Sequence, residues 1–373
     1  MTPRENFLAA LRRAHPDRVP MAISFATAKY REFVQRSGQQ DYYAYYDLPY
    51  RHVPLVPAAA FPDFARYFAG RVPDWPSGDA PIVPRETFVA MGPQQTMMNE
   101  WGEYRIYDNR GDYHTKVNPL PAEECTVADI ETYPFPDLRA PARYEGIAEA
   151  MAALQARGLA AVLAWEMTIF EKAWRIRGME NLMVDLTTAP AVVECLVEQI
   201  SSRTGYLAAR YAALGGDVVQ LGDDIGTQHG MMLSPTAWRR FFKPSMARIV
   251  AGIKAANPHT LVFYHSDGNI GEVIPDMLDI GIDILNPVQA ECMDIAALKR
   301  DYGTRLSFWG GMGVQTTLPF GSPADVRAAV RHLIRDAGAG GGLVVAPGHV
   351  LEHDVPWENI EAFVEAVREY SRS

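Results

Sequence analysis

The sequence predicts an α/β fold, a (β/α)8 barrel of the TIM type with an elaborated N-terminal region. Three observations support this prediction. From residue 138 onward, helical segments alternate with short apolar runs, which is typical of parallel strands joined by right-handed crossovers. Polar clusters follow several of these runs, as expected at a barrel mouth, where the carboxyl ends of the strands meet. A length of 373 residues suits one such barrel with insertions.

The N-terminal segment begins with a predicted helix at residues 3–14. Thr2 is the expected N-cap, Pro3 occupies the first helical position, and Glu5 completes a capping box. A proline at position 16 ends this helix, because the residue before a proline disfavours the helical conformation.

An apolar strand is expected next, at residues 21–25. Residues 26–135 are rich in tyrosine and proline and only weakly periodic, so we interpret them as helices and loops that cover one end of the barrel. They include a small hairpin at 103–117, indicated by the turn sequence NRGD at 109–112. One barrel strand has to lie hidden in this region if the total is to reach eight.

The remaining chain reads as six pairs of a helix and a following strand. No low-complexity linker interrupts them, so we expect a single domain over residues 1–373. The pairs are 144–157 with 160–165, 189–214 with 218–221, 235–256 with 261–264, 270–278 with 284–285, 295–301 with 306–309, and 323–337 with 343–345, followed by a closing helix at 356–370.

Composition and charge restrict the class of function. The net charge is −10 and no basic run exceeds two residues, which argues against a nucleic-acid partner. The three cysteines form no C-x-x-C pair, which fits a reducing compartment. We see no signal-peptide pattern, and the longest apolar stretch, 159–165, is too short to cross a membrane. We therefore expect a cytoplasmic protein that acts on a small molecule, with no membrane partner.

The strongest functional signal is a pair of polar clusters that each follow an apolar run. These clusters are HSDG at 265–268 and PGH at 347–349. At a shared barrel mouth, His265, Asp267 and His349 would meet despite their separation in the chain. The residue types fit metal binding, proton transfer or loop tethering, and the pattern alone leaves all three open.

Five further polar residues stand at or near predicted strand ends. Asp223 and Asp224 are candidate catalytic groups, as a general base or as the holder of a substrate cation; the alternative is that they cap a turn or helix. Glu166 is a candidate substrate-binding residue, because a carboxylate at the end of an apolar strand is hard to explain by packing. Asn286 and Gln289 would hydrogen-bond a ligand or, alternatively, secure a turn.

Three tryptophans are candidates for the floor of an apolar pocket. They are Trp101, Trp174 and Trp309, and the competing interpretation is that all three belong to the core. We assign Trp174 to substrate binding.

Eight short motifs, in a consistent order over nearly the whole chain, resemble the uroporphyrinogen decarboxylase superfamily. This superfamily contains the haem-pathway decarboxylases and the methyltransferases that work with corrinoid proteins. Each motif is weak by itself, and together they are specific. The resemblance implies a single α/β barrel and a homodimer. The motifs are PDRVP at 16–20, NEWG at 99–102, FEKAW at 170–174, RGME at 177–180, GDDIG at 222–226, HSDG at 265–268, GIDILNPVQ at 281–289 and PGH at 347–349.

The methyltransferase branch implies a metal. Its members hold zinc on a His-x-Cys motif after one strand and a cysteine after the last, and these places are occupied here by His265, Asp267 and His349. Zinc is the expected ion, although ferrous iron and manganese accept the same ligands. Loss of both sulfurs makes the ion a harder Lewis acid, which suits an oxygen-bearing substrate. The favoured hypothesis is methyl transfer between a small substrate and a carrier such as a corrinoid protein.

The true decarboxylase branch resembles this chain less well. It uses an arginine-rich loop after the first strand to hold the carboxylates of a tetrapyrrole, whereas the matching stretch here offers Lys29, Tyr30 and Arg31. We assign Lys29 and Tyr30 to substrate binding. The second hypothesis is a metal-free decarboxylase of an acidic substrate such as uroporphyrinogen, with His349 as proton donor. The third is a catalytically silent barrel that binds a ligand or a corrinoid partner.

Overall fold

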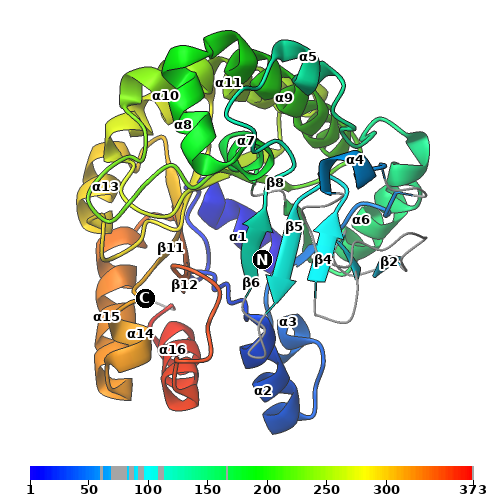
Figure 1. Ribbon diagram of the computed structural model, residues 1–373. Coiled ribbons are helices and arrows are strands. Elements are labelled where there is room, and N and C mark those ends of the chain that lie inside the picture. Colours follow the sequence, from blue (N-terminus) through cyan, green and yellow to red (C-terminus); the bar gives the residue numbers. More distant parts are fainter. Residues whose placement is uncertain are drawn as a thin grey trace.

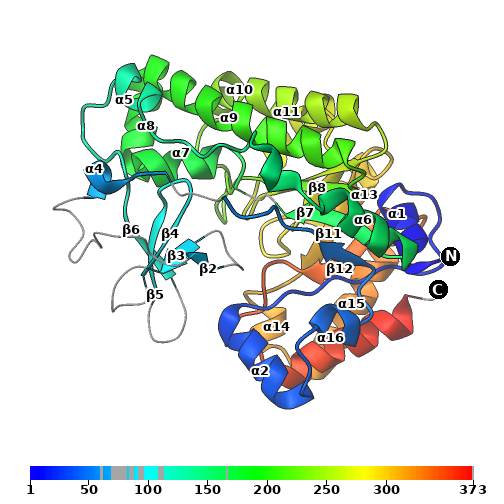
Figure 2. The same ribbon diagram turned by 90° about the vertical axis from the view of Figure 1, so that its right-hand side faces the viewer.

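A computed structural model describes residues 1–58, 62–68, 82–83, 88–90, 96–107, 113–164 and 167–371. Its central feature is a curled sheet of seven parallel strands, and helices pack around the outside of this sheet (Figures 1 and 2). The predicted α/β barrel class is confirmed. In spatial order the strands are β1 (Tyr50–His52), β7 (Ala160–Ala164), β8 (Val218–Gly222), β9 (Leu261–His265), β10 (Ile284–Asn286), β11 (Ser307–Met312) and β12 (Leu343–Pro347).

Residues 21–25 lie next to β12, at the place of an eighth barrel strand. This segment runs parallel to β12 and is joined to it by isolated bridges, Met21 with Val345 and Phe25 with Leu351. The backbone N–H of Ala22 donates to the Val345 carbonyl oxygen at 2.9 Å. The predicted strand at 21–25 is therefore extended chain bridged at both ends, and β1 is the strand hidden in the irregular region.

Helices α9 and α11 cover one side of the barrel and α15 and α16 another (Figures 1 and 2). The helices are α1 (Pro3–Leu11), α2 (Thr27–Ser37), α3 (Tyr42–Tyr45), α4 (Ala65–Phe68), α5 (Val127–Glu131), α6 (Ile147–Ala156), α7 (Phe170–Arg177), α8 (Met179–Thr188), α9 (Pro190–Ala213), α10 (Pro235–Phe241), α11 (Lys243–Ala256), α12 (Ile274–Ile280), α13 (Ile295–Tyr302), α14 (Thr317–Phe320), α15 (Pro323–Ala337) and α16 (Trp357–Tyr370).

The helical predictions hold with local differences. The capping box of α1 is present, but the helix ends at Leu11 because Arg13 adopts a positive φ of 59°. The helix expected at 235–256 is two helices, α10 and α11. A proline at position 244 explains the break, because it has no N–H to continue the helical hydrogen bonds.

A second sheet, antiparallel, lies beside α7 in the region expected to be irregular (Figures 1 and 2). Its strands, in order, are β2 (Ile82–Val83), β3 (Phe88–Ala90), β4 (Thr96–Asn99), β5 (Tyr104–Tyr107) and β6 (Tyr113–Val117). The predicted hairpin is confirmed as β5 and β6, and it belongs to a larger sheet than we expected. Its turn at 109–112 lies outside the described residues.

Trp309, on β11, is buried and contacts three other aromatic rings. Its ring meets those of Phe7, Tyr50 and Phe263 edge to face, with centroids 5.3, 5.1 and 5.3 Å away. Tyr50, Phe263 and Trp309 also line a small cavity together with His265. In the described part of the chain, no helix combines the length and the apolar character needed to span a bilayer.

Candidate active site

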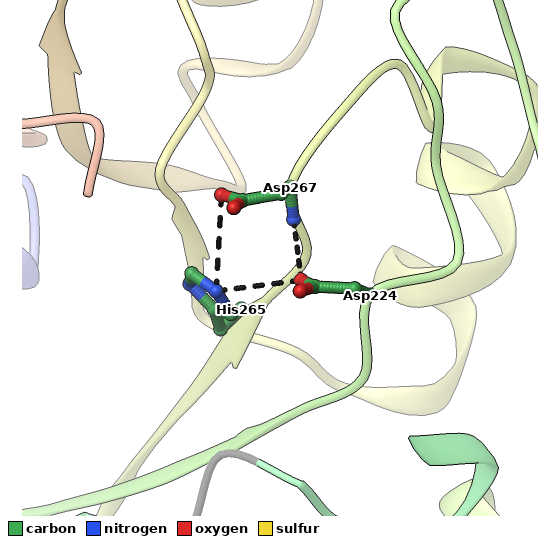
Figure 3. A group of neighbouring side chains, drawn as sticks. All are labelled: Asp224, His265 and Asp267. Atoms are coloured by element: carbon green, nitrogen blue, oxygen red, sulfur yellow. Dashed lines mark hydrogen bonds and ion pairs between the residues drawn. The ribbon is translucent and has the colours of Figure 1, made fainter. Parts of the chain in front are cut away.

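Three side chains at the carboxyl ends of β8 and β9 converge on one point of the barrel mouth (Figure 3). His265 is the last residue of β9, Asp267 lies two residues beyond it, and Asp224 follows β8. His265 Nε2 lies 3.4 Å from an Asp224 carboxylate oxygen and 3.8 Å from one of Asp267. One ligand atom from each residue lies within 4.8 Å of the others. The group therefore has the size and the donor atoms of a metal site.

Glycines let the two loops that carry these residues approach each other. A Cβ atom at Gly222 would lie 2.4 Å from the carbonyl oxygen of His265, so only glycine fits beside that histidine. Further along, Gly226 and Gly268 bring the loop backbones together, since a Cβ at Gly268 would lie 2.5 Å from the Gly226 carbonyl carbon. The backbone N–H of Asp267 then donates to the Asp224 carboxylate at 2.8 Å (Figure 3).

The hydrogen bonds of Asn286 fix which nitrogen of His265 carries the proton. Asn286 Nδ2 donates to the Trp309 carbonyl oxygen at 2.6 Å, so its Oδ1 is the atom that faces His265 Nδ1. An amide oxygen only accepts, so Nδ1 must be the donor. In the neutral imidazole this leaves the Nε2 lone pair directed at the two carboxylates, which is the state that binds a metal. Asn286 thus orients His265, and because it also lines a cavity at the mouth, its position is compatible with the expected substrate contact.

Asp223 does not face the mouth. Its carboxylate accepts hydrogen bonds from the backbone N–H groups of Ile169 and Glu171, at 2.9 and 3.0 Å, and so caps the N-terminus of α7. Only 2% of the residue is exposed. Burial raises the pKa of Asp223 to about 8 and Glu171 acts in the same sense, while the backbone donors oppose them. These contacts match the capping alternative for Asp223, and Asp224 is the aspartate that faces His265.

Glu171 is a neighbour of the site that sequence reasoning did not single out. It lies on α7 and accepts a hydrogen bond from the backbone N–H of Asp224 at 3.3 Å. Burial raises the pKa of Glu171 and the charge of Asp224 adds to this, whereas Arg175 and His265 lower it. Its signal in the sequence was only its place in the FEKAW motif, because a glutamate inside a helix carries no strand-end signature.

Two cavities lie at the mouth, and His349 lines both. The outer one, of about 550 Å³, also takes in Asp267 and Gln289, and the inner one, of about 130 Å³, takes in His265 and Asn286. His349 is half exposed and its Nδ1 lies 4.0 Å from a Glu352 carboxylate oxygen. Among the described residues, the compact donor group contains Asp224 in the place we had expected for His349.

Gln289 lines the outer cavity, yet its side-chain oxygen accepts from the backbone N–H of Gly268 at 3.1 Å. Both interpretations of this residue, ligand contact and loop support, are therefore compatible with its position. Glu166 lies outside the described residues.

The three remaining substrate-binding predictions are not supported by position. Lys29 is buried, and its ammonium donates to Glu32 at 2.7 Å and to the Val355 carbonyl oxygen at 2.8 Å. Tyr30 donates to the Gln40 carbonyl oxygen, and the Trp174 ring lies under the guanidinium of Arg175. None of the three lines either cavity at the mouth, and the polar or aromatic group of each is engaged in the contact given above.

One imidazole nitrogen and two carboxylate oxygens form a ligand set that zinc, ferrous iron and manganese all accept. The hydrogen bond from His265 Nδ1 to Asn286 is the outer support usual for a metal-binding histidine. The residues present therefore fit a divalent ion.

The comparisons with known proteins agree with the architecture. The family model described as uroporphyrinogen decarboxylase (URO-D) matches residues 111–370. A uroporphyrinogen decarboxylase of Coxiella burnetii is 28% identical over 186 residues, which cover 49% of this chain and 48% of that protein, so the match spans about half of that relative's length. One from Pseudomonas syringae pv. syringae is 26% identical over 256 residues, covering 66% of this chain and 69% of that protein.

Among solved structures, a methyltransferase from Methanosarcina mazei superposes with a TM-score of 0.66. The superposition covers 99% of both chains at 16% identity, which establishes a shared fold. Together, the family match over more than half of the chain and the common barrel settle the relationship: the chain belongs to the uroporphyrinogen decarboxylase family.

Proposed function

We propose that this protein is a metal-dependent methyltransferase that acts on a small oxygen-bearing substrate. The observation that carries the proposal is the orientation of His265, whose Nδ1 is engaged with Asn286 while its Nε2 faces the carboxylates of Asp224 and Asp267. The proposed ligand set is thus Asp224, His265 and Asp267. The methyltransferase with the same barrel is in line with this assignment.

A divalent ion bound at this group would supply Lewis acidity toward a substrate oxygen. The substrate would enter through the outer cavity and occupy the inner one, next to His265. In the demethylation direction, the electron pair of the O–CH3 bond stays on the oxygen and the methyl carbon bonds to a nucleophilic carrier, such as a corrinoid protein. The oxygen then takes up a proton. Asn286 would keep the His265 ring oriented throughout, with Nε2 directed at the two carboxylates.

Elemental analysis of the purified protein tests the proposal. We expect about one equivalent of zinc, iron or manganese in the wild type, and loss of the metal in Asp224→Asn and Asp267→Asn. His349→Ala is the matched control, because His349 lies at the rim outside the donor group, and it should retain the ion. A wild type that neither carries nor takes up a divalent metal would overturn the proposal. Loss of metal in His349→Ala but not in Asp224→Asn would overturn the ligand set.

A second candidate is favoured by the curated relatives, which are uroporphyrinogen decarboxylases. In that case the reaction would be metal-free decarboxylation of an acidic substrate, with His349 at the rim as the proton donor. Burial of Lys29 against Glu32 removes one cation that such a substrate would need. Turnover of uroporphyrinogen by metal-stripped protein would decide for this candidate.

A further inference from the structure

The inner cavity contains a buried amide oxygen without a hydrogen-bond partner among the described residues. Gln220 lies in the middle of β8 with 4% of its surface exposed, and it lines this cavity. Its Oε1 is buried and has no hydrogen-bond partner among the described residues. Buried polar groups are nearly always paired, because desolvation without a partner is costly. An unpaired amide oxygen facing a cavity therefore indicates a ligand that supplies the missing hydrogen bond.

The strand register places Gln220 below the metal-type group. Gln220 pairs with Phe263 and Gly222 pairs with His265, so Gln220 lies two residues deeper along the barrel wall than His265. At about 3.3 Å of rise per residue, the two levels are about 6.6 Å apart. A ligand that reaches both levels needs two functional groups, one at each end.

The other residues that line the inner cavity restrict the chemistry of the middle part of that ligand. Tyr50, Phe263 and Trp309 contribute aromatic surface, and among the described lining residues none is Lys, Arg, Asp or Glu. The volume of about 130 Å³ is close to that of an engineered apolar cavity of ~150 Å³ that binds benzene. The space therefore suits one uncharged ring.

We propose that Gln220 is a specificity-determining residue that recognises the far end of a small, neutral, two-ended aromatic substrate. The near end is an O-methyl group placed next to His265, and the far end is a hydroxyl that donates a hydrogen bond to the Gln220 Oε1. A methoxyarene with a hydroxyl para to the methoxy group has this arrangement. The identity of the near end rests on the function proposed above, whereas the role of Gln220 rests on the cavity alone.

Calorimetric titration with three probes tests the proposal. The probes are 4-methoxyphenol, anisole, which lacks the hydroxyl, and 4-methoxybenzoate, which replaces it with a charge. Wild-type protein should bind 4-methoxyphenol at least tenfold more tightly than either of the others. Gln220→Leu should lose this preference and bind 4-methoxyphenol and anisole about equally. No binding of 4-methoxyphenol at millimolar concentration, or an unchanged preference in Gln220→Leu, would overturn the inference.

The melting temperature of Gln220→Leu is a second measurement. A ligand-binding role and a structural role of Gln220 predict opposite changes in it. Because the amide oxygen has no partner among the described residues, Gln220→Leu should keep or raise the melting temperature. A clear fall in melting temperature would show that Gln220 supports the fold instead. Metal content separates this inference from the proposed function: a hydroxyl preference in wild type without any bound metal would sustain Gln220 and overturn the metal site.

Discussion

Asn286 shows how one side chain can decide the chemistry of another. Its amide is held by the Trp309 carbonyl oxygen, so only its oxygen remains for His265. A histidine oriented in this way directs Nε2 at the metal-type group, which is how a second hydrogen bond sets the ligand nitrogen of a metal-binding histidine. Asn286 therefore acts through His265 and is a positioning residue.

Replacement of Asn286 by leucine should weaken metal binding while leaving the three ligands intact. We expect affinity for a divalent ion to fall about 10- to 100-fold, the range typical of lost outer-shell partners, because His265 would no longer be held in one tautomer and orientation. Competition with a chromophoric chelator measures this affinity. Gln228→Leu, an exposed amide at the same mouth, is the control. Equal affinity in wild type and Asn286→Leu would contradict the positioning role.

The sequence could identify some of these residues and not others, for physical reasons. His265, Asp267 and Asp224 follow apolar strands, and parallel strands bring such positions together. The choice between Asp223 and Asp224 was undecidable from sequence, because adjacent residues point in different directions. Gln220 was not predicted as a site residue, because the sequence does not show that the strand position it occupies faces a cavity inside the barrel.

The loops after β8 and β9 form a pair of elements in backbone contact. Their separation is set by Gly226 and Gly268, and Gly268 also has a positive φ of 78°. Ser266 adds a hydrogen bond between the loops, since its Oγ accepts from the backbone N–H of Ile225 at 3.1 Å. The metal-type group depends on this contact, because Asp224 and Asp267 stand on opposite loops.

Gly268→Ala should be markedly more destabilising than Gly38→Ala. Both glycines have positive φ, and in each the left-handed conformation should cost alanine about 1–2 kcal/mol. A methyl at Gly38 meets nothing within 4 Å, whereas one at Gly268 would collide with the Gly226 backbone, which adds about 1–3 kcal/mol. Urea denaturation gives both free energies of unfolding. Equal losses would mean that the loops separate freely.

Helices and strands were predicted correctly where the local sequence pattern was strong. They were missed where the residues that stabilise them lie far away in the sequence. The strands and long helices after residue 138 follow from their periodicity. The bounds of helices α7 and α8 were not predicted, and α7 has no local side-chain cap, since Asp223 supplies the cap from over fifty residues away. Strand β1 is only three residues long and becomes recognisable only through its pairing with β7.

At the scale of the whole molecule, buried charges join the antiparallel sheet region to the barrel. Arg143 makes a two-pronged ion pair with Glu100, at 2.7 and 2.9 Å, and Arg175 pairs with Glu103. Lys172 lies among these groups with its ammonium 4.6 Å from the centre of the Trp101 ring. Burial lowers the pKa of Lys172 to about 8, and nearby Glu103 opposes this.

This pKa predicts a pH-dependent contribution to stability. Between pH 8 and about 10.5 the unfolded chain keeps the Lys172 proton and the folded chain releases it, so this contribution rises with pH, by up to ~3 kcal/mol. Urea denaturation of wild type and Lys172→Met over this range should show the extra rise only in wild type. Lys172→Arg, which stays charged throughout, should also lack it. Parallel curves for all three proteins would contradict the shifted pKa.

The bridge between Met21 and Val345 has a consequence for biosynthesis. These partners are 324 positions apart, so residues 21–25 cannot pair with β12 until nearly all of the barrel has left the ribosome. At about 5–20 residues per second, the first strand position waits at least ~16 s for β12. During that interval the apolar edge of residues 21–25 has no neighbour on one side, and a nascent chain in this condition is a natural client for a chaperone.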